Sequence, residues 1–254
     1  MCFTVAIVRN NVLQTIKQYY DSLPDEWKKD DMDIDLDLPF LQDSYFSSGF
    51  TNPQLLVIQK EGVFPMQWGL IPSWTKGPSE AKDIGLKTLN ARSESVFEKS
   101  SFRKSIESRR GILPVLGFFE WQDVQKQKYP YFIYHPENKG FAMGAIFDKW
   151  LNPQTGQIVT SFSMVTTEAN ALMADIHNTK KRMPLIIPPE SIGSWLHDNN
   201  PATIQSLMKP FDEAQMSAHT ISRKANSTRE NRDYPGIIEK VSYPELNQSQ
   251  QLLF

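Results

Sequence analysis

The cysteine at position 2 is the first residue whose chemistry depends on its place in the chain, and it is the single cysteine of the sequence. Loss of Met1 would leave it with a free α-amino group that titrates at about 7.7–8.0, beside a thiol that titrates at about 8.5. Such a 1,2-aminothiol turns an aldehyde into a Schiff base and then into a five-membered thiazolidine. The alternative is a small buried hydrophobic side chain at the start of a strand.

Two further groups are candidates for proton transfer. Glu120 is an isolated carboxylate in the apolar run GFFEW at 117–121, where burial would raise its pKa toward that of a general acid or base. Strand alternation leaves inward and outward orientations of this side chain equally open. His177 follows the expected helix 169–176, and it is either a helix C-cap or a proton shuttle that titrates near neutral pH.

One asparagine and two arginines, Asn90, Arg92 and Arg182, are candidates for binding an anion. Asn90 and Arg92 lie two residues apart, so they share a face of a strand or loop, and arginine pairs with phosphate through two hydrogen bonds. A helix cap at Ser93 explains part of this motif equally well. Arg182 ends a basic triplet, KKR at 180–182, that is either a phosphate-binding patch or a solvated loop.

Trp68 and Trp74 flank a turn that contains glycine and proline, in the run WGLIPSW. Aromatic side chains exposed on a loop can stack on nucleobases or wedge between them. The alternative is that the indoles pack in the core beneath the turn.

Composition narrows the class of protein. With 254 residues, 40 % hydrophobic and 11 % aromatic, the chain can fill a core, so wholesale disorder is excluded. No run of ~20 apolar residues predicts a membrane span, and the first residues do not form a secretory signal. The net charge of −2 requires any nucleic-acid site to be a local patch. One cysteine and scattered histidines predict no metal and no cofactor, and we expect a cytoplasmic monomer.

The elements that would position these residues are mostly strands without regular βαβ alternation. We predict an α+β fold in a single domain, with a mainly antiparallel sheet or barrel-like core and short peripheral helices. The domain would span 1–222, with an acidic connector at about 21–50, and a polar tail would occupy 223–254. Predicted strands are 3–8, 55–59, 63–71, 110–121, 129–134, 141–149, 159–166, 184–188 and 216–221. Predicted helices are 10–20, 94–108, 169–176, 189–197 and 202–208.

The order of these blocks resembles the SOS response-associated peptidase family, whose members are also called abasic-site processing proteins. The blocks are Cys2, WGLIPSW at 68–74, NARSE at 90–94, GFFEW at 117–121, and His177 ahead of RMP at 182–184. The resemblance implies a DNA-damage-response protein that captures abasic sites in single-stranded DNA. Capture would proceed through a thiazolidine link from Cys2, exposed by self-processing or an aminopeptidase, and an AP-lyase activity is also implied.

The same resemblance implies a role for each residue. Asn90 would position the α-amine and the sugar, Glu120 would act as general acid and base, and His177 would be the second such group. The implied DNA-binding residues are Arg92, on a phosphate, Trp68, as a wedge at the lesion, Trp74 and Arg182. One departure is that Phe3 and Thr4 stand where the family usually has Gly-Arg, so an arginine beside the nucleophile is missing.

Two other functions fit the same residues. In a Cys/His peptidase or an N-terminal-nucleophile amidohydrolase, Cys2 would attack an amide carbonyl and Asn90 would help to stabilise the oxyanion. In a non-catalytic single-strand binder, the tryptophan loop and the basic patch would bind undamaged DNA without a covalent product.

Overall fold

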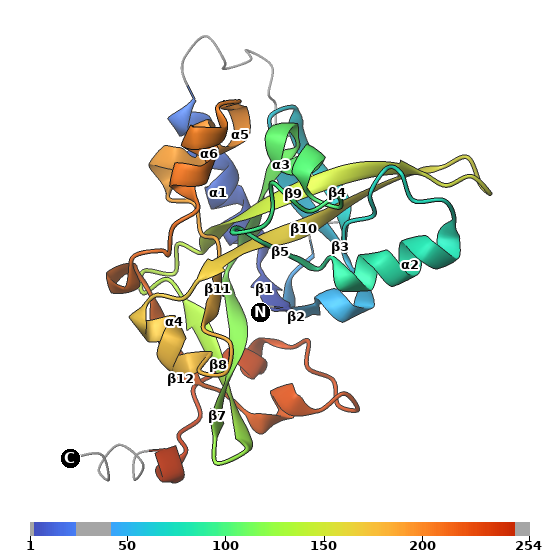
Figure 1. The fold of residues 1–254 in the computed structure, drawn as a ribbon. Helices are drawn as coiled ribbons and strands as arrows, with labels where there is room; N and C mark the ends of the chain where they lie inside the picture. The colour runs from blue at the N-terminus through green and yellow to red at the C-terminus, as the bar shows by residue number, and fades with distance from the viewer. Residues whose placement is uncertain (1–2, 24–41, 247–254) are drawn as a thin grey trace.

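The computed structural model describes residues 3–23 and 42–246. They form a β-barrel and a second, antiparallel sheet that extends from one end of the barrel, with short helices around both (Figure 1). The predicted α+β class, with a barrel-like antiparallel core and short peripheral helices, is confirmed.

The barrel closes because strand β10 has partners along both of its edges. Five strands follow one another in the order β10, β4, β3, β6, β9, and β9 pairs again with β10. The β10–β4 contact is parallel and the other four are antiparallel. The barrel strands are β3 (Gln54–Gln59), β4 (Gly62–Trp68), β6 (Arg110–Val115), β9 (Phe141–Leu151) and β10 (Ile158–Glu168).

Two short strands attach to the end of β10 and carry residues singled out in the sequence. Strand β5 (Asn90–Arg92) pairs with β10 in parallel, and β11 (Arg182–Pro184) pairs with it antiparallel. The registers overlap at Thr166, which pairs with Arg92 on one strand and with Pro184 on the other. The 90–94 motif and the segment after His177 are therefore held against the same residue of β10.

The second sheet has the strand order β12, β8, β7, β1, β2. Its strands are β1 (Thr4–Ile7), β2 (Ser44–Ser48), β7 (Gly117–Val124), β8 (Gln127–Tyr134) and β12 (Ser217–Thr220). The single strand predicted over 110–121 is two strands, because the chain leaves the barrel at Leu116, whose N–H donates to Ala6 of β1. Gly117 permits this crossing, since a Cβ there would lie 2.4 Å from the carbonyl oxygen of Ile133.

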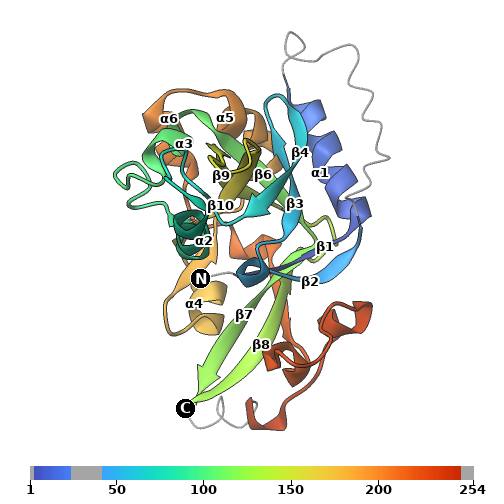
Figure 2. The ribbon, with the colours of Figure 1, turned by 90° about the vertical axis from the view of Figure 1, so that its right-hand side faces the viewer.

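The helices lie outside the sheets, as Figure 2 shows for α1 beside the barrel. The helix predicted over 94–108 is wrong over its first part, where the chain forms turns anchored by buried Val96 and Phe102 and becomes helical only at α3. The α-helices are α1 (Arg9–Ser22), α2 (Pro78–Lys87), α3 (Arg103–Ser108), α4 (Ala171–Ile176), α5 (Ile192–His197) and α6 (Pro201–Leu207). The 3-10 turns are η2 (Gly49–Thr51), η3 (Pro189–Ser191), η4 (Glu213–Gln215), η5 (Arg223–Asn226) and η6 (Pro235–Ile238).

Two hydrophobic clusters stabilise the two sheets. The larger fills the barrel and the space under α1 and α5, and the smaller covers one face of the second sheet around Phe46 and Phe119. Ala225 and Ile237, from the segment expected to be a loose polar tail, are buried in the smaller cluster. The first part of the tail therefore packs on the sheet, because isolated apolar side chains anchor an otherwise polar segment.

The acidic connector predicted at about 21–50 lies largely outside the described residues, which omit 24–41. Its described ends belong to α1, β2 and η2. Among the helices that the structure describes, we find none with the length and apolar character that crossing a bilayer would require.

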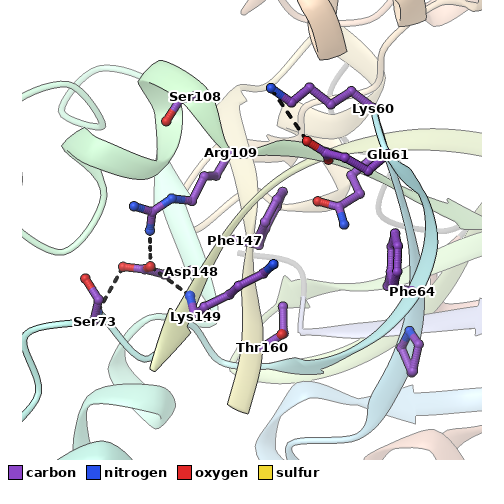
Figure 3. Close-up of a pocket in the computed structure, with 12 residues that line it drawn as sticks. Lys60, Glu61, Phe64, Ser73, Ser108, Arg109, Phe147, Asp148, Lys149 and Thr160 are labelled. Carbon is purple, nitrogen blue, oxygen red and sulfur yellow. Dashed lines mark hydrogen bonds and ion pairs between the residues drawn. The ribbon is translucent and has the colours of Figure 1, made fainter. Parts of the chain in front are cut away.

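A hollow of about 770 Å³ on the flank of the barrel is organised by a buried carboxylate (Figure 3). Asp148 of β9 is 4 % exposed, forms an ion pair with Arg109, and accepts the backbone N–H of Ser73 at 2.9 Å. It also accepts the N–H of Lys149 at 2.7 Å. Asp148 thus ties the loop after β4 and the end of α3 to one barrel strand.

Replacement of this carboxylate should destabilise the fold. Asp148→Ala removes the acceptor of the Ser73 N–H and the partner of Arg109, and should lower the free energy of unfolding by about 2–3 kcal/mol, below the usual cost of a fully buried pair because Arg109 is partly hydrated. Urea denaturation measures the change. Lys149→Ala, at the adjacent exposed side chain, is the matched control and should change stability by less than about 0.5 kcal/mol. Equal stabilities of the two variants would contradict the assignment.

Candidate active site

A cavity of about 500 Å³ lies where the start of β1, the η2 turn, β7 and the loop after α4 meet the η5 segment. Phe3, Glu120 and His177 line it. Cys2 lies outside the described residues, but Phe3, the residue that follows it, is at this cavity. Among the residues that the structure describes, the lining is Phe3, Thr4, Phe46, Ser48, Phe50, Glu120, Trp121, Asp123, Lys128, His177, Thr179, Lys180, Ala225, Asn226, Thr228 and Arg232.

Glu120 is buried, with 3 % of its surface exposed. Strand β7 is covered on both faces: Phe118 packs in the larger cluster, and Phe119 packs in the smaller one. Alternation places Glu120 on the same face as Phe118. The sequence left the orientation of Glu120 open, because a strand that is buried on both faces shows no alternation of polar and apolar residues. In the structure the side chain points inward.

His177 is positioned by a helix end and a tight turn. Helix α4 is capped at its start by Asn170, whose side chain accepts the N–H of Met173, and at its end by His177. The chain then turns back through Lys181 in the left-handed region, at φ +48°, and Lys181 donates its N–H to the His177 carbonyl. The Arg182 carbonyl lies 2.9 Å from His177 Nδ1. Because a carbonyl oxygen only accepts, Nδ1 carries the hydrogen, and the lone pair of the neutral ring is on Nε2.

Glu120 and His177 lie side by side in the cavity and are the two candidate groups for proton transfer. His177 Nδ1 lies 3.8 Å from Glu120 Oε1, and both side chains are buried. Burial raises the pKa of Glu120 to about 7, against an opposing effect of the positive charge on Lys180. Burial likewise lowers the pKa of His177 to about 4, although its hydrogen bond to Arg182 acts in the other direction. Near neutral pH the imidazole is therefore uncharged and the carboxyl exchanges its proton readily, so the contact is not an ion pair.

A comparison with known protein families identifies the family of this chain. The family model described as SOS response associated peptidase (SRAP) matches residues 14–228, a span that includes Glu120 and His177. The chain belongs to this family.

Two named relatives and one solved structure are similar to this SRAP chain. Abasic site processing protein YoqW of Bacillus subtilis (strain 168) is 38 % identical over 177 residues, which cover 68 % of this chain and 75 % of the relative. Abasic site processing protein HMCES of Rattus norvegicus is 33 % identical over 199 residues, covering 66 % of this chain and 54 % of the relative. A crystal structure of a protein from Bacteroides thetaiotaomicron has a TM-score of 0.83 and 33 % identity, and covers 95 % of this chain and 100 % of its own.

Arg182 of this SRAP chain was predicted to bind DNA, but its side chain lies inside the protein. Its guanidinium is buried, forms an ion pair with Glu94, and donates to the Thr166 carbonyl at 2.7 Å. Lys180 and Lys181, the other members of the triplet, are exposed. Arg182 therefore connects the 90–94 motif to β10, and its own carbonyl orients His177.

Asn90 and Arg92 lie on β5, in register with Met164 and Thr166 of β10. Asn90 is half-buried and Arg92 is exposed. Neither is among the described residues that line the 500 Å³ cavity.

The two tryptophans have opposite environments. Trp68 is fully buried, stacks on Phe162 with ring centroids 6.0 Å apart, and donates its Nε1–H to the Leu89 carbonyl at 2.9 Å. A fully buried indole cannot wedge into DNA, so its expected role is replaced by a structural one. Trp74 is 48 % exposed, in the turn before α2, and it is absent from the described lining of the cavity.

Several lining residues carried no sequence signal for this site. Phe50, Lys128 and Arg232 are isolated in sequence and converge only through the fold. Arg232 stacks over the Phe46 ring at 4.5 Å, so the segment expected to be a polar tail contributes to the cavity wall. Among the described residues that line the larger hollow of Figure 3, by contrast, none was predicted for the site.

Replacement of Glu120 should change how stability depends on pH. Below pH 4.5 the carboxyl is protonated in both the folded and the unfolded chain, whereas between 4.5 and about 7 only the unfolded chain ionises. The wild type thus loses up to about 3 kcal/mol of stability as pH rises through this window. Glu120→Gln lacks this loss and should be the more stable protein at pH 8.

The measurement is urea denaturation of both proteins from pH 4.5 to 8, read as the difference between them so that other titrating groups cancel. Glu190→Gln, the same substitution at an exposed position, is the matched control. A flat difference for Glu120→Gln would show that the buried carboxyl does not titrate in this range.

Proposed function

We propose that this chain captures abasic sites in single-stranded DNA by forming a thiazolidine between Cys2 and the ring-opened sugar. Removal of Met1 would precede capture, by self-processing or by an aminopeptidase, and slow cleavage of the DNA strand would be a side activity of the same intermediate. The proposal makes the protein part of a DNA-damage response.

One observation carries the proposal: a carboxyl with a pKa of about 7 and a neutral histidine line the cavity that Phe3 also lines. An aldehyde substrate needs proton transfers at every stage, and a group whose pKa is near the working pH both gives and accepts protons efficiently. The names of YoqW and HMCES, as abasic site processing proteins, support the choice of an abasic sugar as the aldehyde.

The chemistry balances without a further reactant. Glu120 transfers a proton as the sugar ring opens to the aldehyde, and the α-amine of Cys2 adds to C1′ to give a carbinolamine. Protonation of its hydroxyl releases water and leaves the imine. The thiol then adds across the C=N bond, with sulfur on carbon and hydrogen on nitrogen, which closes the thiazolidine.

Cationic side chains around the cavity support a DNA strand as the carrier of the sugar. Lys128, Lys180 and Arg232 line it, and Asp123 is an opposing charge there besides Glu120. They would compensate for the arginine that the family usually has at position 4, where this chain has threonine. Arg92, exposed on β5, would bind a further phosphate.

Cys2→Ala should abolish covalent capture, because it removes the sulfur that closes the ring. The wild type and the variant are each mixed with a single-stranded oligonucleotide that carries one abasic site, and with an undamaged strand as control. Denaturing electrophoresis and intact mass should show a wild-type adduct that lacks Met1, and at least about a hundredfold less adduct for the variant.

Three results would contradict the proposal. Full crosslinking by Cys2→Ala would exclude Cys2 as the nucleophile. Hydrolysis of glutamine or a peptide that depends on Cys2, with no DNA adduct, would indicate an amidohydrolase or peptidase. Salt-dependent binding of undamaged strands without any adduct would indicate a non-catalytic binder.

Two arginine variants separate phosphate binding from positioning. Arg92→Gln should lower the slope of log affinity against log salt by about 0.7, the value for one phosphate contact with a single strand. Arg182→Gln should leave this slope unchanged, because its guanidinium is buried on Glu94 and Thr166. It should slow crosslinking by at least about tenfold, because the backbone carbonyl that orients His177 loses the side-chain anchor that fixes its position. A changed slope for Arg182→Gln would restore it as a DNA-contacting residue.

A further inference from the structure

Two phenylalanines form a pair at the edge of the 500 Å³ cavity. The rings of Phe3 and Phe50 lie 4.9 Å apart between centroids, at an interplanar angle of 42°. Phe50 is 59 % exposed although it is fully apolar. Both line the cavity that contains Glu120 and His177. The two packed rings, one of them open to solvent, thus form an apolar surface beside Glu120 and His177.

The backbone under this pair is fixed. Gly49 donates its N–H to the Phe3 carbonyl at 2.8 Å, and the η2 turn closes with the Asn52 N–H on the Gly49 carbonyl at 3.0 Å. A Cβ on Gly49 would lie 3.1 Å from the Trp68 indole, so the turn rests directly on that buried ring. Asn52 also donates its side-chain N–H to the Trp68 carbonyl at 2.7 Å. Phe50 is therefore presented in a preorganised position rather than on a loose loop.

The charges around the pair indicate what binds it. Lys128, Lys180 and Arg232 line the same cavity, so an apolar surface and three cations face one space. A nucleotide combines these requirements, because its base offers a π-face and its phosphate a negative charge. An apolar peptide would leave the cations without partners, and a free phosphate would leave the rings exposed.

We propose that Phe50, supported by Phe3, is the stacking subsite for the nucleobase that flanks the abasic site. The inference rests on the proposed function, and it adds a subsite that reads the neighbour of the lesion. Phenylalanine offers no hydrogen bond to a base edge, so the subsite accepts any base and prefers purines, whose larger rings stack over more area. Stacking would hold the strand while the sugar lies beside Glu120.

The test measures non-covalent affinity on a strand that carries a tetrahydrofuran in place of the abasic sugar, since this analogue has no aldehyde and cannot crosslink. Phe50→Ala should weaken binding by about tenfold, and Phe50→Trp should retain or tighten it. Phe64→Ala is the matched control, because Phe64 is 41 % exposed but lines the other hollow, and its affinity should equal that of the wild type. Thermal unfolding confirms that each variant is folded.

A second arm identifies the base. The strand is also made without the base on the 5′ side of the analogue, and separately without the base on its 3′ side. For one of these, loss of the base should weaken the wild type by about tenfold and leave Phe50→Ala unchanged, because the two deletions remove the same contact. If removal of either base weakened binding by Phe50→Ala by the same factor as binding by the wild type, Phe50 would not contact that base. This result on both the 5′ and the 3′ side would overturn the stacking subsite.

Failure of the subsite is distinguishable from failure of the function. Each protein is also mixed with a strand that carries a true abasic site. If the wild type crosslinks but Phe50→Ala binds the analogue as tightly as the wild type, the subsite is overturned and the function stands. If the wild type forms no adduct, the proposed function is overturned. The subsite is overturned as well if removal of the flanking base and Phe50→Ala also act independently on affinity.

Discussion

The hydrogen bonding of β10 is the constraint on which the rest of the structure depends. A strand has two edges, and β10 uses both: β9 pairs along Ile158–Met164 on one edge, and β4 and then β5 pair along the other. Beyond the end of β9 pairing, β11 continues the ladder to Glu168. A shift of β10 by one residue would reverse every side chain between the barrel interior and its exterior, so its register is strongly fixed. The segments at 90–92 and 182–184 inherit that rigidity.

The buried charges of this fold fall into two kinds. Arg110 donates to the carbonyls of Ile106, Glu107, Trp195 and Asp198, and Asp148 accepts from two backbone N–H groups and Arg109. At both residues, several hydrogen-bond partners replace the lost hydration. At Glu120 the loss of hydration wins, and the pKa rises to about 7. The fold thus surrounds Arg110 and Asp148 with partners, whereas at Glu120 it buries a carboxyl whose pKa is near neutral, at a cost in stability as the pH rises.

The sequence predicts best those features that follow from local patterns. Apolar and β-branched runs located most strands, and Cys2, Glu120 and His177 were found because their types and spacing have chemical meaning. The sequence predicts less well those residues that share one local pattern but differ in burial or in the sheet to which they belong. The run at 110–121 is apolar throughout, so nothing in it marks the change of sheet at Leu116. Trp68 and Trp74 flank the same turn, yet one is fully buried and the other half exposed. Arg182 reads as part of a basic patch, and only tertiary contact with Glu94 shows that it is internal.

The residues of the site that lie far apart in the sequence could not be predicted from local sequence patterns. The cavity wall combines Phe3 and Phe50 with Arg232, which stacks over Phe46 from the far end of the described chain. Strand β1 lies between β2 and β7, so Phe3 reaches the cavity only when both of its neighbours are paired. Assembly of the site therefore requires contacts of high sequence separation, which form late because the loops that they close are long. A partly folded chain has neither the buried carboxyl nor the covered β7 face that raises its pKa. The contact between Glu120 and His177, and the buried setting of both side chains, thus exist only in the complete fold.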